Sequence, residues 1–335
     1  MSGTIIITGA NSSLAIPMVQ HILSKYPGYH LILTVRNPSG DTDVNTKRLR
    51  AVLEQHPGVA DKTSIRALDL ANLSAVHAFT EGLAAEIAAG TLPRVAAVVC
   101  NAYYWNLVDA PVLTRDGLET ALQVNHVAHA ALVLRLLTAT TFASGGRVVF
   151  LGTNATDPGA NSLEKYPPVL PNDLDDLARV PEHVDSSERA GTGFHRYALS
   201  KLAVTMFSYA LNRRLEKDPD LNTVTAVTIN PGNLADSRAL QTNTPRALAV
   251  AQTLLLKPLR PLLAFADPTI RTAAAAGTDV AELATGHAHP GARGFFTLLK
   301  ESKSSDESLK VDKQEEVWRK TLAWAKVDPK NEKWK

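Results

Sequence analysis

The stretch "TIIITGANSSLA" (residues 4–15) predicts a strand, a tight turn and the start of a helix in immediate succession. Its first residues are apolar and β-branched, which is typical of a buried strand, and a helix-like pattern follows the small residues of the turn. In such a unit, glycine lets the backbone approach a pyrophosphate, and the helix N-terminus favours negative charge. Gly9 is retained, whereas Ser13 and Ala15 stand where glycine is usual. We interpret the turn as a dinucleotide-binding site; an ordinary strand-to-helix turn is the alternative.

The rest of the chain repeats this alternation of short apolar runs and longer amphipathic segments. The runs are almost continuously apolar, which indicates strands of a parallel sheet that is covered on both faces. A periodicity near 3.6 residues predicts helices over 14–26, 73–89 and 117–142. The predicted fold class is therefore α/β, a single-domain, doubly wound (Rossmann) parallel seven-stranded sheet with helices on both faces. The strands are expected at residues 4–8, 30–36, 63–70, 95–100, 147–153, 223–229 and 293–299.

Composition argues against several classes of function. The 335 residues include 35 basic and 33 acidic ones, so no charge excess favours nucleic acid. The ten histidines show no spacing suited to metal ligands, and Cys100 is the only cysteine, which rules out an internal disulfide. No apolar run approaches transmembrane length, and the N-terminal residues do not resemble a signal peptide. We expect a cytoplasmic protein that holds no metal and binds no nucleic acid.

Arg36 ends the second predicted strand, where dinucleotide-binding folds meet the adenosine ribose. A carboxylate at this point would bind the ribose hydroxyls of NAD, whereas a guanidinium pairs with the 2′-phosphate of NADP. Since no acidic residue follows before Asp41, the sequence favours NADP(H); a solvated surface arginine is the alternative. Asp69, at the end of the third predicted strand, is a candidate for the adenine edge or else belongs to the cap region of the next helix.

Tyr197 and Lys201 are four residues apart in "RYALSKLAV" (196–204), so a helix would place them on one face. A tyrosine has an ordinary pKa of about 10, and a neighbouring ammonium lowers that pKa by favouring the phenolate. Tyr197 could then exchange a proton with a carbonyl or alcohol oxygen while hydride moves at carbon.

Taken in order, these motifs resemble the short-chain dehydrogenase/reductase superfamily over residues 4–300. The resemblance implies that Tyr197 is the general acid/base and that Thr153 replaces the family's substrate-binding serine. It also implies that Asn125 holds a water in a proton relay to Lys201, which binds the nicotinamide ribose. The matching motifs are "TGANSSLA" (8–15), Arg36, "LDL" (68–70), "CNA" (100–102), "LQVNH" (122–126), "VVFLGT" (148–153), "YALSK" (197–201) and "INPGNL" (229–234).

The same resemblance implies a set of cofactor-binding residues along the edge of the sheet. Tyr103, in place of a glycine after "CNA", and the altered turn at 13 and 15 mark a divergent member, as does Asp236 or Ser237 in place of a cofactor-contacting threonine. The implied cofactor-binding residues are Gly9, Asn11, Ser12, Ser13, Leu14, Arg36, Asp69, Leu70, Asn101, Ala102, Tyr197, Lys201, Pro231, Gly232, Asn233 and Leu234.

Three segments interrupt the regular alternation. Within a family domain at 1–300, residues 154–193 are expected to form an acidic, Pro-rich insertion near the active site, and 238–284 the substrate lid. Residues 301–335 are expected to be a charged helical extension. For the apolar residues 250–266, a lid, a peripheral membrane contact and a packed helix pair all remain open.

The length and these segments resemble the branch that holds retinol dehydrogenases and 3-keto-steroid reductases. The leading hypothesis is an NADPH-dependent oxidoreductase that interconverts a bulky, largely apolar ketone or aldehyde and its alcohol, as a monomer or homodimer. A non-redox enzyme on the same fold, such as an epimerase, dehydratase or cyclase of a natural-product pathway, is one alternative. An NADP-binding scaffold is the other.

Overall fold

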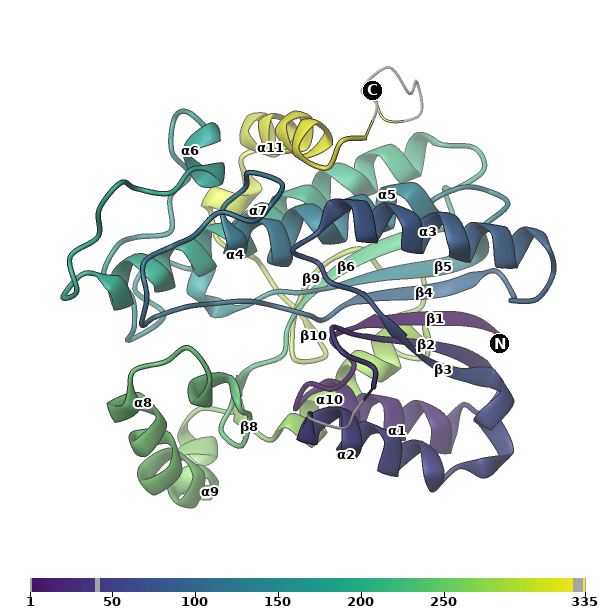
Figure 1. Ribbon diagram of the computed structural model, residues 1–335, viewed down its shortest axis with the longest axis horizontal. Coiled ribbons are helices and arrows are strands. Elements are labelled where there is room, and N and C mark those ends of the chain that lie inside the picture. Colours follow the sequence, from purple (N-terminus) through teal and green to yellow (C-terminus); the bar gives the residue numbers. More distant parts are fainter. Residues whose placement is uncertain (1, 40–42, 328–333, 335) are drawn as a thin grey trace.

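The computed structural model describes residues 2–39, 43–327 and 334, and its centre is a sheet of eight strands (Figure 1). Neighbouring strands are parallel except for the last pair, which is antiparallel. The strand order reverses between β1 and β4, the arrangement that opens a ligand crevice at the carboxyl ends of the strands. In spatial order the strands are β3 (Thr63–Ala67), β2 (Tyr29–Val35), β1 (Gly3–Thr8), β4 (Val95–Cys100), β5 (Phe142–Leu151), β6 (Thr225–Asn230), β9 (Gly294–Thr297) and β10 (Lys300–Glu301).

Helices cover both faces of this sheet, which explains why its central strands are apolar on both sides (Figure 1). One face carries α3 (Leu73–Ala88), α5 (Ala128–Leu136) and α7 (Arg189–Lys217). The other carries α1 (Ala15–Lys25), α2 (Val44–Glu54) and α10 (Ala273–Ala284). Outside these layers are α4 (Thr120–Leu122), a π-helical turn (Gln123–Val127), α6 (Asp175–Ala178), α8 (Arg246–Ala251), a second π-helical turn (Gln252–Leu256), α9 (Lys257–Ala266), α11 (Val311–Trp324) and the short strands β7 (Asn233–Leu234) and β8 (Ile270–Arg271).

Gly277 of α10 brings the second helical layer close to the predicted dinucleotide turn. A Cβ atom at this position would lie 2.8 Å from the carbonyl oxygen of Leu14 and 2.8 Å from the nitrogen of Met18. Any larger residue would therefore push α10 away from the start of α1.

The predicted doubly wound sheet is confirmed, with strands at all seven expected places. The two-residue strand β10 adds an eighth strand as an antiparallel partner of β9. The helix expected over 117–142 is wrong at its end, because hydrogen bonds of the Thr138 hydroxyl with Thr141 make a turn and Phe142 already begins β5. Helix α2 was not predicted, since its exposed, charged sequence carries few apolar positions.

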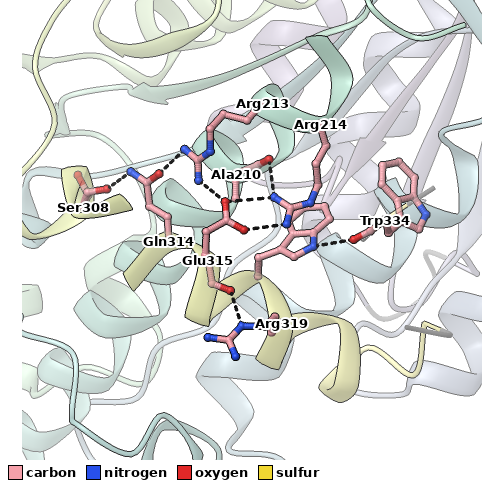
Figure 2. Close-up of polar contacts among 9 residues, drawn as sticks. Ala210, Arg213, Arg214, Ser308, Gln314, Glu315, Arg319 and Trp334 are labelled. Atoms are coloured by element: carbon pink, nitrogen blue, oxygen red, sulfur yellow. Dashed lines mark hydrogen bonds and ion pairs between the residues drawn. The ribbon is translucent and has the colours of Figure 1, made fainter. Parts of the chain in front are cut away.

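The C-terminal helix α11 packs along α7 (Figures 1 and 2). Glu315 accepts from Arg213 at 2.6 Å and from Arg214 at 2.7 Å, as Figure 2 shows. The indole of Trp318 stacks on Phe207 with ring centroids 5.0 Å apart and lies 4.1 Å from the Arg214 guanidinium carbon. The tail therefore adds apolar and ionic contacts to the body of the molecule.

Candidate active site

The predicted dinucleotide turn lies at the carboxyl end of β1, where the strand order reverses. Gly9 has a φ of 60°, and a Cβ there would lie 3.0 Å from the Cα of Ala102, so both conformation and space favour glycine. The Asn101 amide donates to the carbonyl oxygens of Thr8 at 2.8 Å and Gly9 at 3.0 Å, and to the Ser12 hydroxyl at 3.1 Å. Asn101 thus holds the end of β4 against the turn.

The polar residues of the turn gather at the N-terminus of α1. The Ser12 hydroxyl accepts from the Ala15 nitrogen at 3.0 Å, and the Asn11 amide donates to Asp43 at 2.7 Å. The Ser13 hydroxyl accepts from both the backbone nitrogen and Nε of Arg238, each at 3.1 Å. Leu14 is buried, so it anchors the start of the helix rather than presenting a polar group.

Arg36 and Asp69 lie at the outer rim of the site, and both are exposed. Asp69 accepts from the Ala71 nitrogen at 3.0 Å, whereas Asn72 is the residue that caps α3. Leu70 is buried and its carbonyl accepts from Gln123. Asp41 lies outside the described residues.

Tyr197, Lys201 and Thr153 come together at the carboxyl end of β5. Tyr197 and Lys201 share a face of α7, with the Lys201 ammonium 6.0 Å from the phenol ring centroid. Lys201 also donates to the carbonyl oxygen of Leu151 at 2.8 Å. The Thr153 hydroxyl interacts with the Tyr197 phenol and favours its ionised form. One hydroxyl, one phenol and one ammonium therefore meet beside the dinucleotide turn.

The protonation equilibrium of Tyr197 runs opposite to the sequence-based expectation. Burial raises the pKa of Tyr197 above its ordinary value, Tyr103 adds to this rise, and only Thr153 lowers it. The amine of Lys201 is directed to the Leu151 carbonyl, burial lowers its own pKa to about 8, and it does not offset the effect of burial on Tyr197. The phenol of Tyr197 is consequently protonated at neutral pH.

Asn125 occupies the π-helical turn, a local widening of the helix that is frequent at functional sites. Its amide oxygen accepts from the Tyr104 nitrogen at 2.6 Å, and its amide nitrogen donates to the Tyr104 carbonyl at 2.9 Å and to the Ser200 hydroxyl at 2.8 Å. The side chain thus ties the loop after β4 to α7. This role of Asn125 was not foreseen from the sequence.

His129 lies one turn further along and connects Asn125 to β1. Burial lowers the pKa of His129 to about 4, so the ring is neutral and carries one N–H. A carbonyl oxygen can only accept, so Nδ1 donates to the Asn125 carbonyl at 3.1 Å and Nε2 accepts from the Thr8 hydroxyl at 2.9 Å. The only sequence signal was the spacing of Asn125 and His129 by one helical turn.

Aromatic side chains surround Tyr197, and two of them, Trp105 and Phe194, were not predicted from the sequence. The ring centroids of Tyr103, Trp105 and Phe194 lie 6.3, 5.6 and 6.3 Å from that of Tyr197. Tyr103 is 41% exposed, and the charge of Arg238 acts to lower the pKa of its phenol. Tyr103, which replaces a glycine of the family motif, therefore brings a second phenol to the site.

The backbone that follows β6 forms a tightly held turn at the carboxyl end of that strand. Gly232 has a φ of 85°, and a Cβ there would lie 2.5 Å from the Thr269 carbonyl oxygen. Asn233 and Leu234 form β7, in which the Asn233 nitrogen donates to the same Thr269 oxygen at 2.7 Å. Asp236 accepts from the nitrogen of Ala273 at 2.7 Å and so holds the start of α10. These contacts fix the turn that begins at Pro231.

Residues 154–188 of the predicted insertion lie along the N-terminal half of α7, and residues 189–193 are the first residues of that helix. Arg196 donates to the carbonyl oxygens of Asp176 and Leu177, and His195 donates to that of Pro167 at 3.1 Å. Within 238–284, Leu248 joins the apolar cluster around Tyr197, and the Asn243 carbonyl accepts from the Leu107 nitrogen at 2.8 Å. The first part of that segment therefore contacts the site.

The second part, α9, has an apolar face that is exposed, including Leu254 just before it, Leu262 and Phe265. No single helix in the described ranges is long and apolar enough to cross a membrane. Residues 246–254 and 257–266, bent by 74° relative to each other, pass the same criterion of length and composition only as a pair.

Comparison with known proteins gives the following relationships. A family model described as the AcuH dehydrogenase domain matches residues 238–332. The short-chain dehydrogenase iccH of Talaromyces variabilis is 28% identical over 362 residues, covering 97% of this chain and 96% of that protein. The dehydrogenase acuH of Aspergillus aculeatus is 55% identical over 82 residues, which are 24% of this chain and 84% of that protein. Retinol dehydrogenase 12 of Homo sapiens is 27% identical over 234 residues, 68% of this chain and 60% of that protein.

Among solved structures, the NADPH-bound carbonyl reductase from chicken fatty liver has a TM-score of 0.57 at 14% identity, covering 90% of this chain and 99% of that one.

Proposed function

The chain belongs to the short-chain dehydrogenase/reductase superfamily and is an oxidoreductase, and from this premise we propose that it is an NADPH-dependent carbonyl reductase. In this proposal the substrate is a bulky, largely apolar ketone or aldehyde, and the reverse reaction oxidises the corresponding alcohol. The observation that carries it is the meeting of Tyr197, Thr153 and Lys201 beside the dinucleotide turn.

The residues present fit a nicotinamide dinucleotide. The turn combines Gly9 in a left-handed conformation with hydroxyls at Ser12 and Ser13 and the N-terminus of α1, a set suited to a diphosphate. Arg36, exposed after β2, would pair with a 2′-phosphate, which supports NADP(H) over NAD(H). The turn at 231–234 and Asn101 would flank the nicotinamide half. When bound, this cofactor supplies the hydride.

The chain's own residues supply the proton and the orientation of the substrate. Thr153 and Tyr197 would both donate to the carbonyl oxygen, which fixes the reacting carbon between them and the cofactor. The protonated phenol of Tyr197 would give its proton to the oxygen as negative charge develops there.

The aromatic group supports a large apolar substrate. Tyr103 and Trp105 are partly exposed beside Tyr197, so their rings are accessible to a ligand that approaches the phenol. Aromatic side chains with a few polar groups are typical of sites for apolar small molecules. Leu248 extends this surface from the segment at 238–284.

We also propose that the protein is a monomer. Helix α11 lies along α7 and contacts the turn before α5, where the Thr321 hydroxyl accepts from buried His126 at 2.7 Å. The two helices near 117–142 and 194–217, through which family members often associate, are thus partly covered by the chain itself.

The test is oxidation of NADPH against a panel of apolar ketones, with Tyr197→Phe and Tyr209→Phe as a matched pair on α7. Tyr209 hydrogen-bonds Ser304 away from the site, so its variant should keep wild-type activity. Tyr197→Phe should lower kcat by at least about 100-fold while the Kd for NADPH changes by less than about threefold. Tight NADPH binding without turnover on any carbonyl would contradict the proposal, and product formed without net NADPH consumption would favour an epimerase, dehydratase or cyclase.

A further inference from the structure

Arg238, which no family motif includes, lies against the dinucleotide turn. Its Nη2 donates to the Asn11 carbonyl oxygen at 2.7 Å, in addition to the two hydrogen bonds at 3.1 Å that its Nε and backbone nitrogen give to the Ser13 hydroxyl. We propose that Arg238 is a ligand of the cofactor diphosphate and supplies positive charge to a turn that has lost two glycines. This inference rests on the proposed nucleotide-binding function.

The guanidinium of Arg238 lacks a counterion where it lies. Its Nη1 is buried without a hydrogen-bond partner, and no ion pair found within residues 2–39, 43–327 and 334 includes it. Burial lowers the pKa of Arg238, Arg48 acts in the same direction, and Asp43 opposes both. A partly buried cation of this kind is costly unless an anion balances it. An anionic ligand at the turn would balance this charge.

Asp43 does not fill that role, because its carboxylate is already committed. It accepts from the Asn45 nitrogen at 2.9 Å, from the Thr46 hydroxyl at 2.7 Å and from the Asn11 amide at 2.7 Å. These bonds cap α2 and lower the pKa of Asp43. The carboxylate therefore stays charged and is held by donors other than Arg238, on which it acts without a direct hydrogen bond.

The Ser13 hydroxyl completes the donor set for an anion. Since it accepts two hydrogen bonds from Arg238, its own proton is free to be donated. Nε and one hydrogen of Nη2 are given to the turn, so Nη1 and the second hydrogen of Nη2 are the Arg238 donors left for phosphate oxygens, and the helix N-terminus adds backbone N–H groups. Because Arg238 contacts residues 11 and 13 and not the end of β2, the diphosphate is the anion within its reach, whereas the 2′-phosphate would belong to Arg36.

The test compares ligand affinities and needs no turnover. By isothermal titration calorimetry, Arg238→Met should weaken NADPH and 2′-phospho-ADP-ribose, which keeps the diphosphate but lacks nicotinamide, by about 10- to 100-fold. The same variant should bind adenosine 2′-monophosphate, which has no diphosphate, within about twofold of wild type. Arg238→Lys, which keeps the charge but not the fork, should show an intermediate loss. Arg246→Met removes an exposed arginine at the start of α8 and should change nothing.

Two outcomes overturn the assignment of Arg238. One is unchanged affinity of Arg238→Met for 2′-phospho-ADP-ribose, and the other is an equal loss for adenosine 2′-monophosphate, which would indicate a purely structural role. Failure of the proposed function gives a different result. If the wild type binds 2′-phospho-ADP-ribose in an Arg238-dependent way but reduces no carbonyl, the reductase proposal fails and the diphosphate ligand stands.

Discussion

Helices α9 and α11 both lie outside the sheet layers and both carry large apolar side chains, but the chain buries only those of α11. In α11, Val317 and Trp318 are 0% and 1% exposed, whereas in α9 Leu262 and Phe265 are 74% and 94% exposed. The ion pairs of Glu315 join α11 to α7. The comparison separates a helix whose apolar face stabilises the fold from one whose apolar face contributes little to it. The following predictions use this difference.

The largest expected effect is the loss of the α11 anchor. Trp318→Ala removes the stack on Phe207 and the contact with the Arg214 guanidinium, and it leaves a cavity between α11 and α7. We expect the free energy of unfolding to fall by about 3–5 kcal/mol, measured by urea denaturation. Phe265→Ala is the matched control on α9 and should change stability by less than about 0.5 kcal/mol. Equal losses in the two variants would erase the distinction between the helices.

A second contrast concerns the active-site end of α7, where the backbone of the helix lies directly against the loop that follows β4. A Cβ at Gly193 would lie 1.8 Å from the Asn106 carbonyl oxygen, so Gly193→Ala must displace the loop that carries Trp105. We expect a loss of about 1–3 kcal/mol in stability and a rise in KM for the ketone, because the aromatic wall beside Tyr197 moves. Gly82→Ala, at an exposed position of α3 where an added Cβ meets nothing within 4 Å, is the control. It should leave the free energy of unfolding unchanged or raise it. Wild-type KM in Gly193→Ala would mean that the loop is not part of the substrate site.

Acid should loosen α11 before it affects the sheet. Arg214 and Arg213 lower the pKa of Glu315 from its ordinary value near 4.5 to about 2. Between these two values the folded state binds fewer protons than the unfolded state, so this contribution to stability is complete above the ordinary pKa and disappears as pH falls toward the folded one. Glu315 is about one-third exposed, so we expect Glu315→Gln to cost only about 1 kcal/mol at pH 7, after solvent screening, and almost nothing near pH 2. Glu316→Gln on the same helix is the control, and a pH-independent effect of Glu315→Gln would refute the ion-pair explanation.

The parts of the molecule that could be predicted from sequence are those whose signals are local. The turn at 8–15 and the pair Tyr197 and Lys201 lie within single strand–turn–helix or helical segments, and the structure has them on those elements. Arg238 meets Ser13 across 225 positions of the chain, and no short-range pattern indicates such a contact. The predicted direction of the Tyr197 pKa shift was wrong. The spacing of Tyr197 and Lys201 indicates that the two side chains are close, but not how deeply they are buried, and burial has the largest effect on the pKa of Tyr197.

The smallest expected effect concerns the exposed face of α9. Leu262→Ser with Phe265→Ser should change stability by less than about 0.5 kcal/mol, because neither side chain is buried. The KM of this double variant for an apolar ketone should also stay within about twofold of the wild-type value. The residue of this segment that joins the cluster around Tyr197 is Leu248, which belongs to α8 and not to α9. Leu248→Ser is the matched comparison within the proposed lid and should raise KM by about tenfold through lost apolar contact with the substrate. A rise of KM in the α9 double variant would extend the lid over α9. If the wild-type protein sediments with anionic vesicles and the double variant does not, the exposed face of α9, together with Lys257 and Arg260, would instead be a membrane-binding surface.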